Sequence, residues 1–213
     1  MSSKKDSTDN EVTKKLQSDE VIPPEKIKKH PLQNAWTLWF FKNDKSRTWE
    51  DNQRPIITVT TVEDFWALYN HIETPSNLPA ASDYSLFKEG IFPDWEDPRN
   101  EDGGRWIINL DRKKRQENLD NHWLDVLFFL IGEHADAHAH IINGAVVNVR
   151  NKGDKIAVWL AEAGGAKSEA EEEGVVKVGR MVKEKLKLTD KMGFNVHKEE
   201  KARPTGYKQK YFL

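Results

Sequence analysis

The sequence predicts an α+β domain, in which a curved antiparallel sheet carries its helices on one face. Segments typical of strands outnumber those typical of helices. Two strand segments, 145–149 and 156–160, flank the turn Arg150-Asn-Lys-Gly-Asp154, whose Gly-Asp pair favours a tight antiparallel hairpin. Helices on one face leave the other face of the sheet open to water or to a ligand.

Strand segments are recognised by their β-branched and aromatic composition. In chain order they are 35–41 (AWTLWFF), 56–60 (IITVT), 84–87 (YSLF), 105–110 (RWIINL), 145–149 (AVVNV) and 156–160 (IAVWL). Residues 208–213 (KQKYFL) are expected to add a final edge strand.

Three segments have helical patterns. The first begins after Thr61, an N-cap candidate with Asp64 three residues on, and has apolar residues at helical spacing. The second covers 118–133. The third begins at Ser168, where Glu171 completes a capping box, and acidic residues at its start and lysines at its end suit the helix dipole. Gly174 and Gly179 weaken this third helix.

Composition predicts one folded domain, 30–213, after a disordered tail, 1–29, which has too few apolar residues to offset the entropy of ordering. The chain of 213 residues has no cysteine, which excludes disulfides, thiolate zinc sites and thiol nucleophiles. No segment approaches the roughly 18–20 apolar residues of a membrane span, and no secretory signal is visible. A soluble, cytoplasmic protein without membrane contact is expected, with the nucleus and RNA granules as further locations.

Charge argues against a broad nucleic-acid binder, because 33 basic and 35 acidic residues give a net charge of −2. A phosphate ligand would therefore need a small local basic cluster. Arg150, Lys152 and Lys155 lie together around the hairpin turn, and Arg105 is placed to add to them. An arginine fork with lysine point charges suits a phosphate clamp, although a solvated turn would have the same composition.

The eight tryptophans fall into two groups. Trp36, Trp39 and Trp106 lie in strand segments and are expected to pack in the core or on the sheet, while Trp159 could face either side. Trp49 and Trp95 instead lie in two separate polar loops. For each alone surface packing is the simpler reading, but two together suggest that they sandwich a planar ligand.

Glu96, next to Trp95, indicates which planar ligand would fit. A carboxylate only accepts hydrogen bonds, so it selects a ring edge with two N–H donors, which guanine supplies. A positive charge on that ring would strengthen both the stacking and the hydrogen bonds.

These residues lie in stretches that resemble the translation initiation factor 4E family, which binds the mRNA cap. The stretches are His30-Pro-Leu-Gln-Asn34, Trp39-Phe-Phe-Lys-Asn-Asp-Lys-Ser46, Thr61–Asn70, Asp83–Lys88, Gly103-Gly-Arg-Trp106 and Gly144–Arg150 through Trp159. The resemblance covers about 30–213 and includes all eight tryptophans.

The resemblance implies a cupped sheet of about eight strands, three helices on its convex face and a cap slot on its concave face. The ligand implied is 7-methylguanosine-capped mRNA. Trp49 and Trp95 match the stacking indoles, Glu96 the carboxylate on the guanine edge, and Trp159 the residue that contacts the N7-methyl group. Arg150 and Lys155 match the phosphate clamp, with Arg105 and Lys152 in support.

A second surface is suggested by helices that are apolar on more than one side. Val62, Trp66 and Tyr69 form a stripe besides the core face of the first helix, and 118–133 has a similar second face. Deep burial would explain this pattern, and so would a partner helix. The resemblance implies the partner: a Tyr-x-x-x-x-Leu helix of the scaffold factor 4G or of 4E-binding repressors. The matching residues are His30, Pro31, Val62, Trp66, Leu124, Asp125, Phe128, Ile131 and Gly132, of which Asp125 and Phe128 stand where the family usually has glutamate and leucine.

Other motifs carry less. The segment 134–140 contains three histidines, but it is better explained as a solvated loop than as a metal site, and no metal or cofactor is expected. Arg112-Lys-Lys-Arg115 is read as a solvated turn, a localisation signal or a contact to the RNA backbone. Thr205 lies about where the family carries a phosphorylatable hydroxyl.

The function expected is cap binding with recruitment of factor 4G, by a monomer. A translational repressor of the same family is the first alternative. An enzyme acting on nucleotides is the second, but no P-loop, His-Glu-x-x-His or Gly-x-Ser-x-Gly motif is present, so no enzyme is expected. Acceptance of trimethylated caps stays open at this point.

Overall fold

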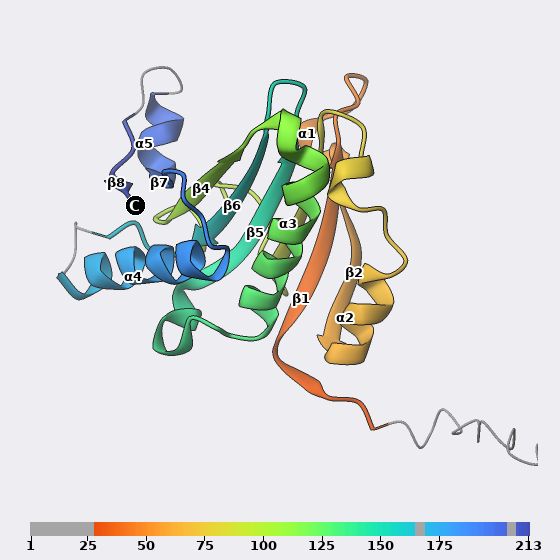
Figure 1. Ribbon diagram of the computed structural model, residues 1–213, viewed down its shortest axis with the longest axis horizontal. Helices are drawn as coiled ribbons and strands as arrows, with labels where there is room; N and C mark the ends of the chain where they lie inside the picture. Colours follow the sequence, from red (N-terminus) through yellow and green to blue (C-terminus); the bar gives the residue numbers. More distant parts are fainter. Residues whose placement is uncertain (1–27, 165–168, 204–207) are drawn as a thin grey trace, which may run out of the picture. The chain divides into compact units, whose positions relative to one another are not determined.

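The computed structural model describes residues 28–164, 169–203 and 208–213 (Figure 1). The chain from Pro31 to Leu213 forms one compact unit. Nearly all of the tail predicted over 1–29, together with Ser168 and Thr205, lies outside the described residues.

One sheet of eight strands organises the unit, and every pairing in it is antiparallel. The order across the sheet is β2-β1-β3-β5-β6-β4-β7-β8. The strands are β1 (Pro31–Lys42), β2 (Gln53–Thr61), β3 (Ser82–Lys88), β4 (Gly104–Leu110), β5 (Ile142–Val149), β6 (Asp154–Leu160), β7 (Gly193–Val196) and β8 (Tyr211–Phe212). The predicted fold class is confirmed.

All six predicted strands and the β5–β6 hairpin are confirmed, and β8 is the expected edge strand. Strands β1 and β2 are longer than predicted. Strand β7 was missed, because four residues with the sequence GFNV carry no recognisable alternation.

Three helices cover one face of the sheet, as predicted: α2 (Val62–Tyr69), α3 (Arg115–Ile131) and α4 (Glu169–Lys185) (Figure 1). Thr61 caps α2, because its hydroxyl accepts a hydrogen bond from the backbone N–H of Asp64 at 3.1 Å. Two short helices were not predicted, α1 (Trp49–Asn52) and α5 (His197–Ala202). Three 3-10 turns complete the described elements: η2 (Pro75–Asn77), η3 (Arg112–Lys114) and η4 (Asp136–Ile141).

The main core lies between the helices and the convex face of the sheet. Its largest fully buried side chains include Trp36, Trp106, Trp123, Phe65, Phe129 and Phe194. Packing explains why α4 contains Gly179 despite the low helix propensity of glycine, because a Cβ at this position would collide with the indole of Trp106. The glycine therefore brings α4 close to the sheet, and this packing compensates for its low helix propensity.

A smaller apolar cluster lies on the opposite, concave face. Side chains alternate along a strand, so the neighbours of convex core residues point to this side. The cluster comprises Phe87, Ile91, Ile107, Val146, Ala157 and Trp159, with Trp95 packed against it. This cluster forms the floor on which the candidate site is built.

Candidate functional site

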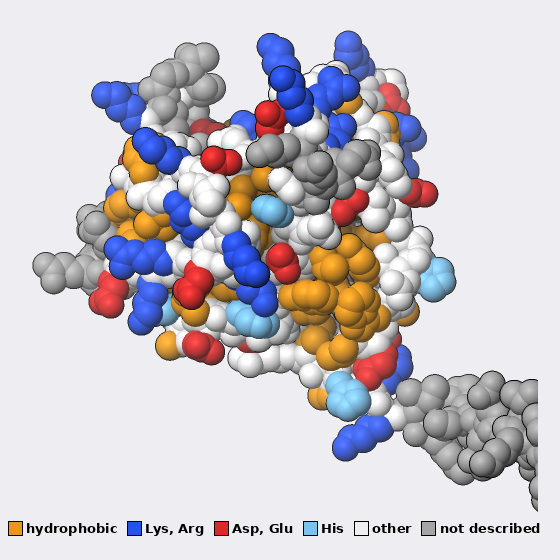
Figure 2. Space-filling model, viewed as in Figure 1, with side chains coloured by type: hydrophobic (Ala, Val, Ile, Leu, Met, Phe, Trp, Pro, Cys, Tyr) orange, Lys and Arg blue, Asp and Glu red, His pale blue; other side chains and the backbone are white. Residues whose placement is uncertain are grey.

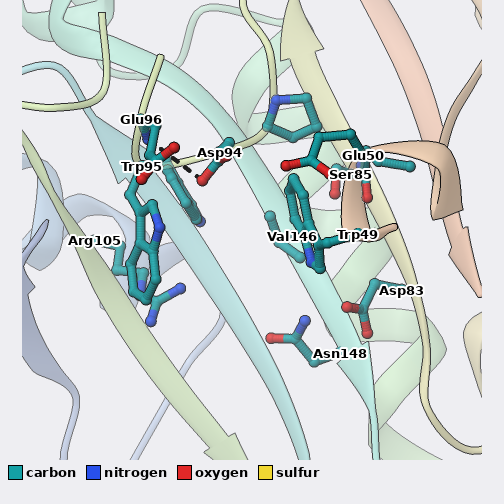
Figure 3. A pocket seen from close by; sticks show the side chains of 13 residues that line it. Trp49, Glu50, Asp83, Ser85, Asp94, Trp95, Glu96, Arg105, Val146 and Asn148 are labelled. Carbon is teal, nitrogen blue, oxygen red and sulfur yellow. Dashed lines mark hydrogen bonds between the residues drawn. The ribbon is translucent and has the colours of Figure 1, made fainter. Parts of the chain in front are cut away.

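A cavity of about 420 Å³ opens on the concave face (Figure 3). Trp49 and Trp95 stand on opposite sides of this slot. Val146 and Trp159, which belong to the concave apolar cluster, also line it. The remaining lining residues are Glu50, Gln53, Asp83, Ser85, Pro93, Asp94, Glu96, Arg105 and Asn148. Two tryptophans from loops 46 positions apart in sequence thus border one space, as the sandwich hypothesis requires.

The first wall is the short helix α1, which begins at Trp49 rather than continuing the polar loop that the sequence suggested. The hydroxyl of Thr48 caps this helix by accepting a hydrogen bond from the backbone N–H of Asp51 at 3.2 Å. The centre of the Trp49 ring lies 5.9 Å from the centre of the Phe41 ring and 6.2 Å from that of the Phe92 ring. With 43% of its surface exposed, Trp49 keeps a free face toward the slot.

The second wall is the loop 89–103, which joins β3 to β4 and carries Trp95. Buried Asn100 holds it: its amide donates to the carbonyl of Phe92 at 2.9 Å and to that of Asp94 at 2.7 Å. The amide of Asn143, on β5, donates to the Asn100 side-chain oxygen at 2.9 Å. These contacts fix both sides of the turn that presents Trp95.

Glu96 follows Trp95 and has an exposed carboxylate at the edge of the slot. The ammonium group of Lys201, on α5, donates a hydrogen bond to Glu96 Oε1 at 2.6 Å. This hydrogen bond is the largest cause of a raised pKa at Lys201. Sequence reasoning missed Lys201, because nothing local links it to a residue 105 positions earlier.

Arg105, on β4, lines the slot and also has a partner on α5. Its guanidinium donates to Glu200 Oε1 at 2.8 Å, and both side chains are largely buried. The guanidinium carbon lies 5.4 Å from the centre of the Trp159 ring, which is a cation–π distance. Consecutive residues of α5 therefore bind two different charged groups of the slot.

Trp159 faces the concave side, which answers the question that the sequence left open. Its ring packs against the rings of Phe87 and His197, with distances between ring centres of 5.5 Å and 4.4 Å. Burial lowers the pKa of His197 to about 4, so the imidazole is neutral near pH 7. The ring nitrogen Nδ1 of His197 bonds the carbonyl of Asn100 at 2.7 Å, which ties α5 to the Trp95 loop.

The predicted phosphate clamp lies beside the slot, and none of its three hairpin residues lines the cavity. The guanidinium of Arg150 is already engaged by both carboxylate oxygens of Asp83, a lining residue. Lys152 lies in the turn and Lys155 on β6, both exposed. Lys155 shares the concave side of β6 with Trp159 and is paired with Asn148, another lining residue. Arg150 therefore stays a predicted phosphate ligand, but its guanidinium is bonded to Asp83 in this structure, which the sequence did not reveal.

The slot is richer in acid than the sequence analysis expected. Among the described residues, the carboxylates of Glu50, Asp83, Asp94 and Glu96 line it, against one guanidinium. Burial raises the pKa of Asp94, and the backbone N–H of Glu96 partly offsets this by donating to its carboxylate. Glu50 and Asp94 are sequence neighbours of the two slot tryptophans, which is a signal that could have found them. An acidic slot between indoles favours a cationic ring.

The second predicted surface is a convex patch made by α2 and α3. Val62 and Trp66 are 37% and 40% exposed, and Trp66 meets Phe128 edge-on with ring centres 5.5 Å apart. In Figure 2 an apolar patch interrupts the charged surface over these helices. Leu124, Asp125 and Phe128 are half-buried, and Pro31, His30 and Gly132 are exposed. Ile131 was predicted to bind a partner, but it is only 9% exposed and belongs to the core.

The histidine-rich segment forms η4 and the residues around it. Among the described residues, no group of three or more His, Asp or Glu side chains could hold a metal ion. In the same part of the chain, no helix is long and apolar enough to cross a membrane.

Comparison with known proteins identifies relatives of the whole compact unit. The family model of eukaryotic initiation factor 4E matches residues 31–211. Eukaryotic translation initiation factor 4E of Homo sapiens is 52% identical over 192 residues, which are 89% of this chain and 85% of the human protein. The factor of Xenopus laevis is 52% identical over 180 residues, which are 84% and 82% of the two chains.

Solved structures agree with this relationship. The complex of Ascaris suum eIF4E-3 with the m2,2,7G cap has a TM-score of 0.80 at 41% identity, covering 87% of this chain and 99% of that one. Caenorhabditis elegans eIF4E-3, in a complex with the 4E-binding protein Mextli and cap analog, has a TM-score of 0.78 at 40% identity, covering 87% and 100%. A schistosome eIF4E with m7GpppG and 4E-BP has a TM-score of 0.78 at 34% identity, covering 87% and 99%.

Proposed function

The chain belongs to the eukaryotic initiation factor 4E family, and on this premise we propose that it binds the 7-methylguanosine cap of mRNA and recruits the scaffold factor 4G to start translation. The observation that carries the proposal is the pair of indoles, Trp49 and Trp95, that border one acidic slot. Cap-bound structures of relatives at 34–41% identity support the same ligand.

The N7-methyl group makes this slot selective. Methylation turns guanine into a cation, so that stacking between Trp49 and Trp95 gains cation–π attraction from both rings. Glu96 would accept hydrogen bonds from N1–H and N2–H of the guanine edge, and the backbone N–H of Trp95 would donate to O6, as the family resemblance implies. Unmethylated guanine keeps these edge contacts and loses the charge.

The triphosphate follows the floor toward the hairpin. Lys155 faces the concave side, and Arg150 meets a phosphate when the ligand displaces Asp83. Arg105 and Lys152 add positive potential on either side. Displacing one anion by another leaves the guanidinium paired in both states, so its desolvation changes little on binding.

Tryptophan fluorescence quenching tests this proposal. We expect 7-methyl-GTP to bind at least about 10-fold more tightly than GTP, because roughly 1.4 kcal/mol of added attraction gives one decade. Affinity for both should fall as salt rises, since the clamp binds phosphates. Equal affinity for the two nucleotides would contradict the sandwich.

The convex patch of Val62, Trp66 and Phe128 is proposed to bind a Tyr-x-x-x-x-Leu helix of factor 4G or of 4E-binding repressors. Structures of relatives with Mextli and 4E-BP support this interaction. Trp66→Ala should abolish capture of such a peptide and leave cap affinity unchanged. Trp49→Ala is the reciprocal control, because it should weaken cap binding and leave capture of the peptide unchanged. Retained capture by Trp66→Ala would rule this surface out.

Two alternatives are separated by simple measurements. A repressor of the same family would bind cap but fail to capture factor 4G. A nucleotide-acting enzyme would release nucleotide from capped RNA with magnesium, and we propose that this chain releases none. We also propose that the protein is a monomer of the cytoplasm, the nucleus and RNA granules, which gel filtration and cell imaging would check.

A further inference from the structure

Glu96 lines two cavities. One is the slot, and the other is a second cavity of about 470 Å³. The second cavity is lined by Trp95, Glu96, Glu101, His197, Lys198, Lys201 and Ala202. The Glu96 side chain, 62% exposed, therefore borders open space besides that of the slot, into which its carboxylate can shift.

Lys201 contacts this carboxylate from the second cavity. Its ammonium group donates to Glu96 Oε1 at 2.6 Å, so one carboxylate oxygen has a hydrogen-bond donor from the protein itself. A carboxylate has about four lone-pair sites, so Glu96 can keep this bond while it accepts others.

The number of hydrogen bonds that the guanine edge can donate to Glu96 depends on methylation at N2. A guanine with one methyl group, at N7, offers donors from both N1 and N2, which together satisfy both carboxylate oxygens. Two methyl groups on N2 remove every N2–H donor and add bulk on the same side. One carboxylate oxygen then faces methyl groups, and an acceptor left without a partner at a contact surface loses affinity.

We propose that Lys201 is a specificity-determining residue, which gives Glu96 a replacement donor and so lets the slot accept the N2,N2,N7-trimethylguanosine cap as well as the monomethyl cap. The inference rests on the proposed cap-binding function and extends it to a second ligand. The second cavity accommodates the shift that the two added methyl groups require, and Lys201 satisfies the carboxylate in its shifted position.

Lys198, on the same short helix, provides a matched control. Its ammonium group lies 2.6 Å from Asp102 and 3.5 Å from Glu101, and its side chain is 55% exposed against 58% for Lys201. Both lysines line the second cavity and carry the same charge. Of these two lysines, only Lys201 contacts Glu96. Replacing either lysine removes the same charge, but only the Lys201 variants change the hydrogen bond to Glu96.

The experiment measures dissociation constants of monomethyl and trimethyl cap analogues by fluorescence quenching, for the full chain and for Lys201→Met, Lys201→Arg and Lys198→Met. The readout is the ratio of the trimethyl constant to the monomethyl constant, in which changes common to both ligands cancel. Lys201→Met should raise this ratio about fivefold by removing the donor. Lys201→Arg keeps a donor and should stay within twofold of the parent chain, as should Lys198→Met.

Three outcomes would overturn the inference: a ratio within twofold of the parent for Lys201→Met, an equal rise for Lys198→Met, or no measurable trimethyl binding by the parent chain. None of these affects the proposed function, which fails separately if the parent chain does not bind the monomethyl analogue. Thermal unfolding midpoints of all variants show that the ratio is measured on folded protein.

Discussion

The two walls of the slot present the same side chain on very different supports. Trp95 sits on a loop that is held from inside by buried Asn100, and Asn100 is itself bonded by Asn143 and His197. Trp49 begins a four-residue helix that is supported by the Thr48 cap, by ring contacts with neighbouring aromatics, and by buried Asn52, whose bonds to Asp44 stay within the same loop. One wall is part of the folded body, and the other lies on its surface.

This contrast indicates how a ligand is gripped. Buried hydrogen bonds are costly to break, because each polar group left without a partner costs about 1–3 kcal/mol. Exposed ring contacts and a helix cap cost less to rearrange. We therefore expect the Trp95 wall to set the position of the bound ring, and the Trp49 wall to close onto it.

The largest expected effect comes from removing the two indoles. Trp95→Ala should weaken binding of the monomethyl cap analogue about 100-fold, and Trp49→Ala about 10-fold, within the roughly 1–3 kcal/mol of one stacked aromatic. The Trp95 ring is pre-positioned, so none of its stacking energy is spent on ordering. Isothermal titration calorimetry on both variants checks the order, and a larger loss for Trp49→Ala would invert the comparison.

Asparagines in the two walls provide the next test. Asn100→Ala leaves the carbonyls of Phe92 and Asp94 without their donor, so the free energy of unfolding should fall by about 2–3 kcal/mol. Asn52, in the Trp49 wall, donates to one carbonyl, that of Asp44, at 2.9 Å and accepts from the Asp44 backbone N–H at a longer 3.4 Å, so Asn52→Ala should cost less, about 1–2 kcal/mol. Urea denaturation measures both, and equal losses would mean that the walls are equally fastened.

Acid should loosen the Trp95 wall through His197. Burial is the main cause that lowers its pKa from 6.5 to about 4; Arg105 lowers it further, and the Asn100 carbonyl and Glu200 raise it. The imidazole of His197 therefore becomes protonated near pH 6.5 in the unfolded chain, but only near pH 4 in the folded chain. The contribution of His197 to the free energy of unfolding is constant above about pH 6.5. It falls as the pH is lowered, by about 2 kcal/mol between pH 7 and pH 5.

The control for this pH effect is His197→Gln, which does not titrate. Urea denaturation at pH 7 and pH 5 should show a smaller loss for His197→Gln than for the parent chain. If both lose the same free energy, other groups account for the acid sensitivity.

The smallest effect is expected from the cap of α1. Thr48→Ala removes the hydroxyl that accepts from the backbone N–H of Asp51, which should cost about 1 kcal/mol or less because the helix is short and exposed. Thr48→Ser keeps the hydroxyl and should behave as the parent chain. Cap affinity should fall only a few-fold in Thr48→Ala, and a loss as large as that of Trp49→Ala would show that α1 is as rigid as the opposite wall.

Much of the slot was predictable because its residues differ in type from their neighbours in the sequence. Trp49 and Trp95 are large apolar residues in polar surroundings, and Glu96 is adjacent to one of them. The three main helices and most strands follow from periodicity and capping, which act over a few residues. Strand β7 and helix α5 are too short for such patterns, and they were missed.

The pairings of charged groups were not predictable. Glu96 with Lys201, Arg105 with Glu200 and Arg150 with Asp83 each join residues at least 67 positions apart. Their partners depend on which strands are neighbours and on where α5 lies. Ile131 was predicted to belong to the partner surface from the family resemblance, and its 9% exposure could not be read from the sequence, since helical periodicity does not reveal how deeply a face is buried.

The sequence by itself determined most of the strands, the three covering helices and the kind of ligand chemistry to expect, because these depend on side-chain type and on spacing over a few residues. Only the tertiary structure decided that the two indoles meet across one cavity, and that α5 supplies counter-charges to both Glu96 and Arg105. The physical reason is that charge pairing and stacking act over a few ångströms. Which residues come that close depends on the order of the strands in the sheet and on the position of α5.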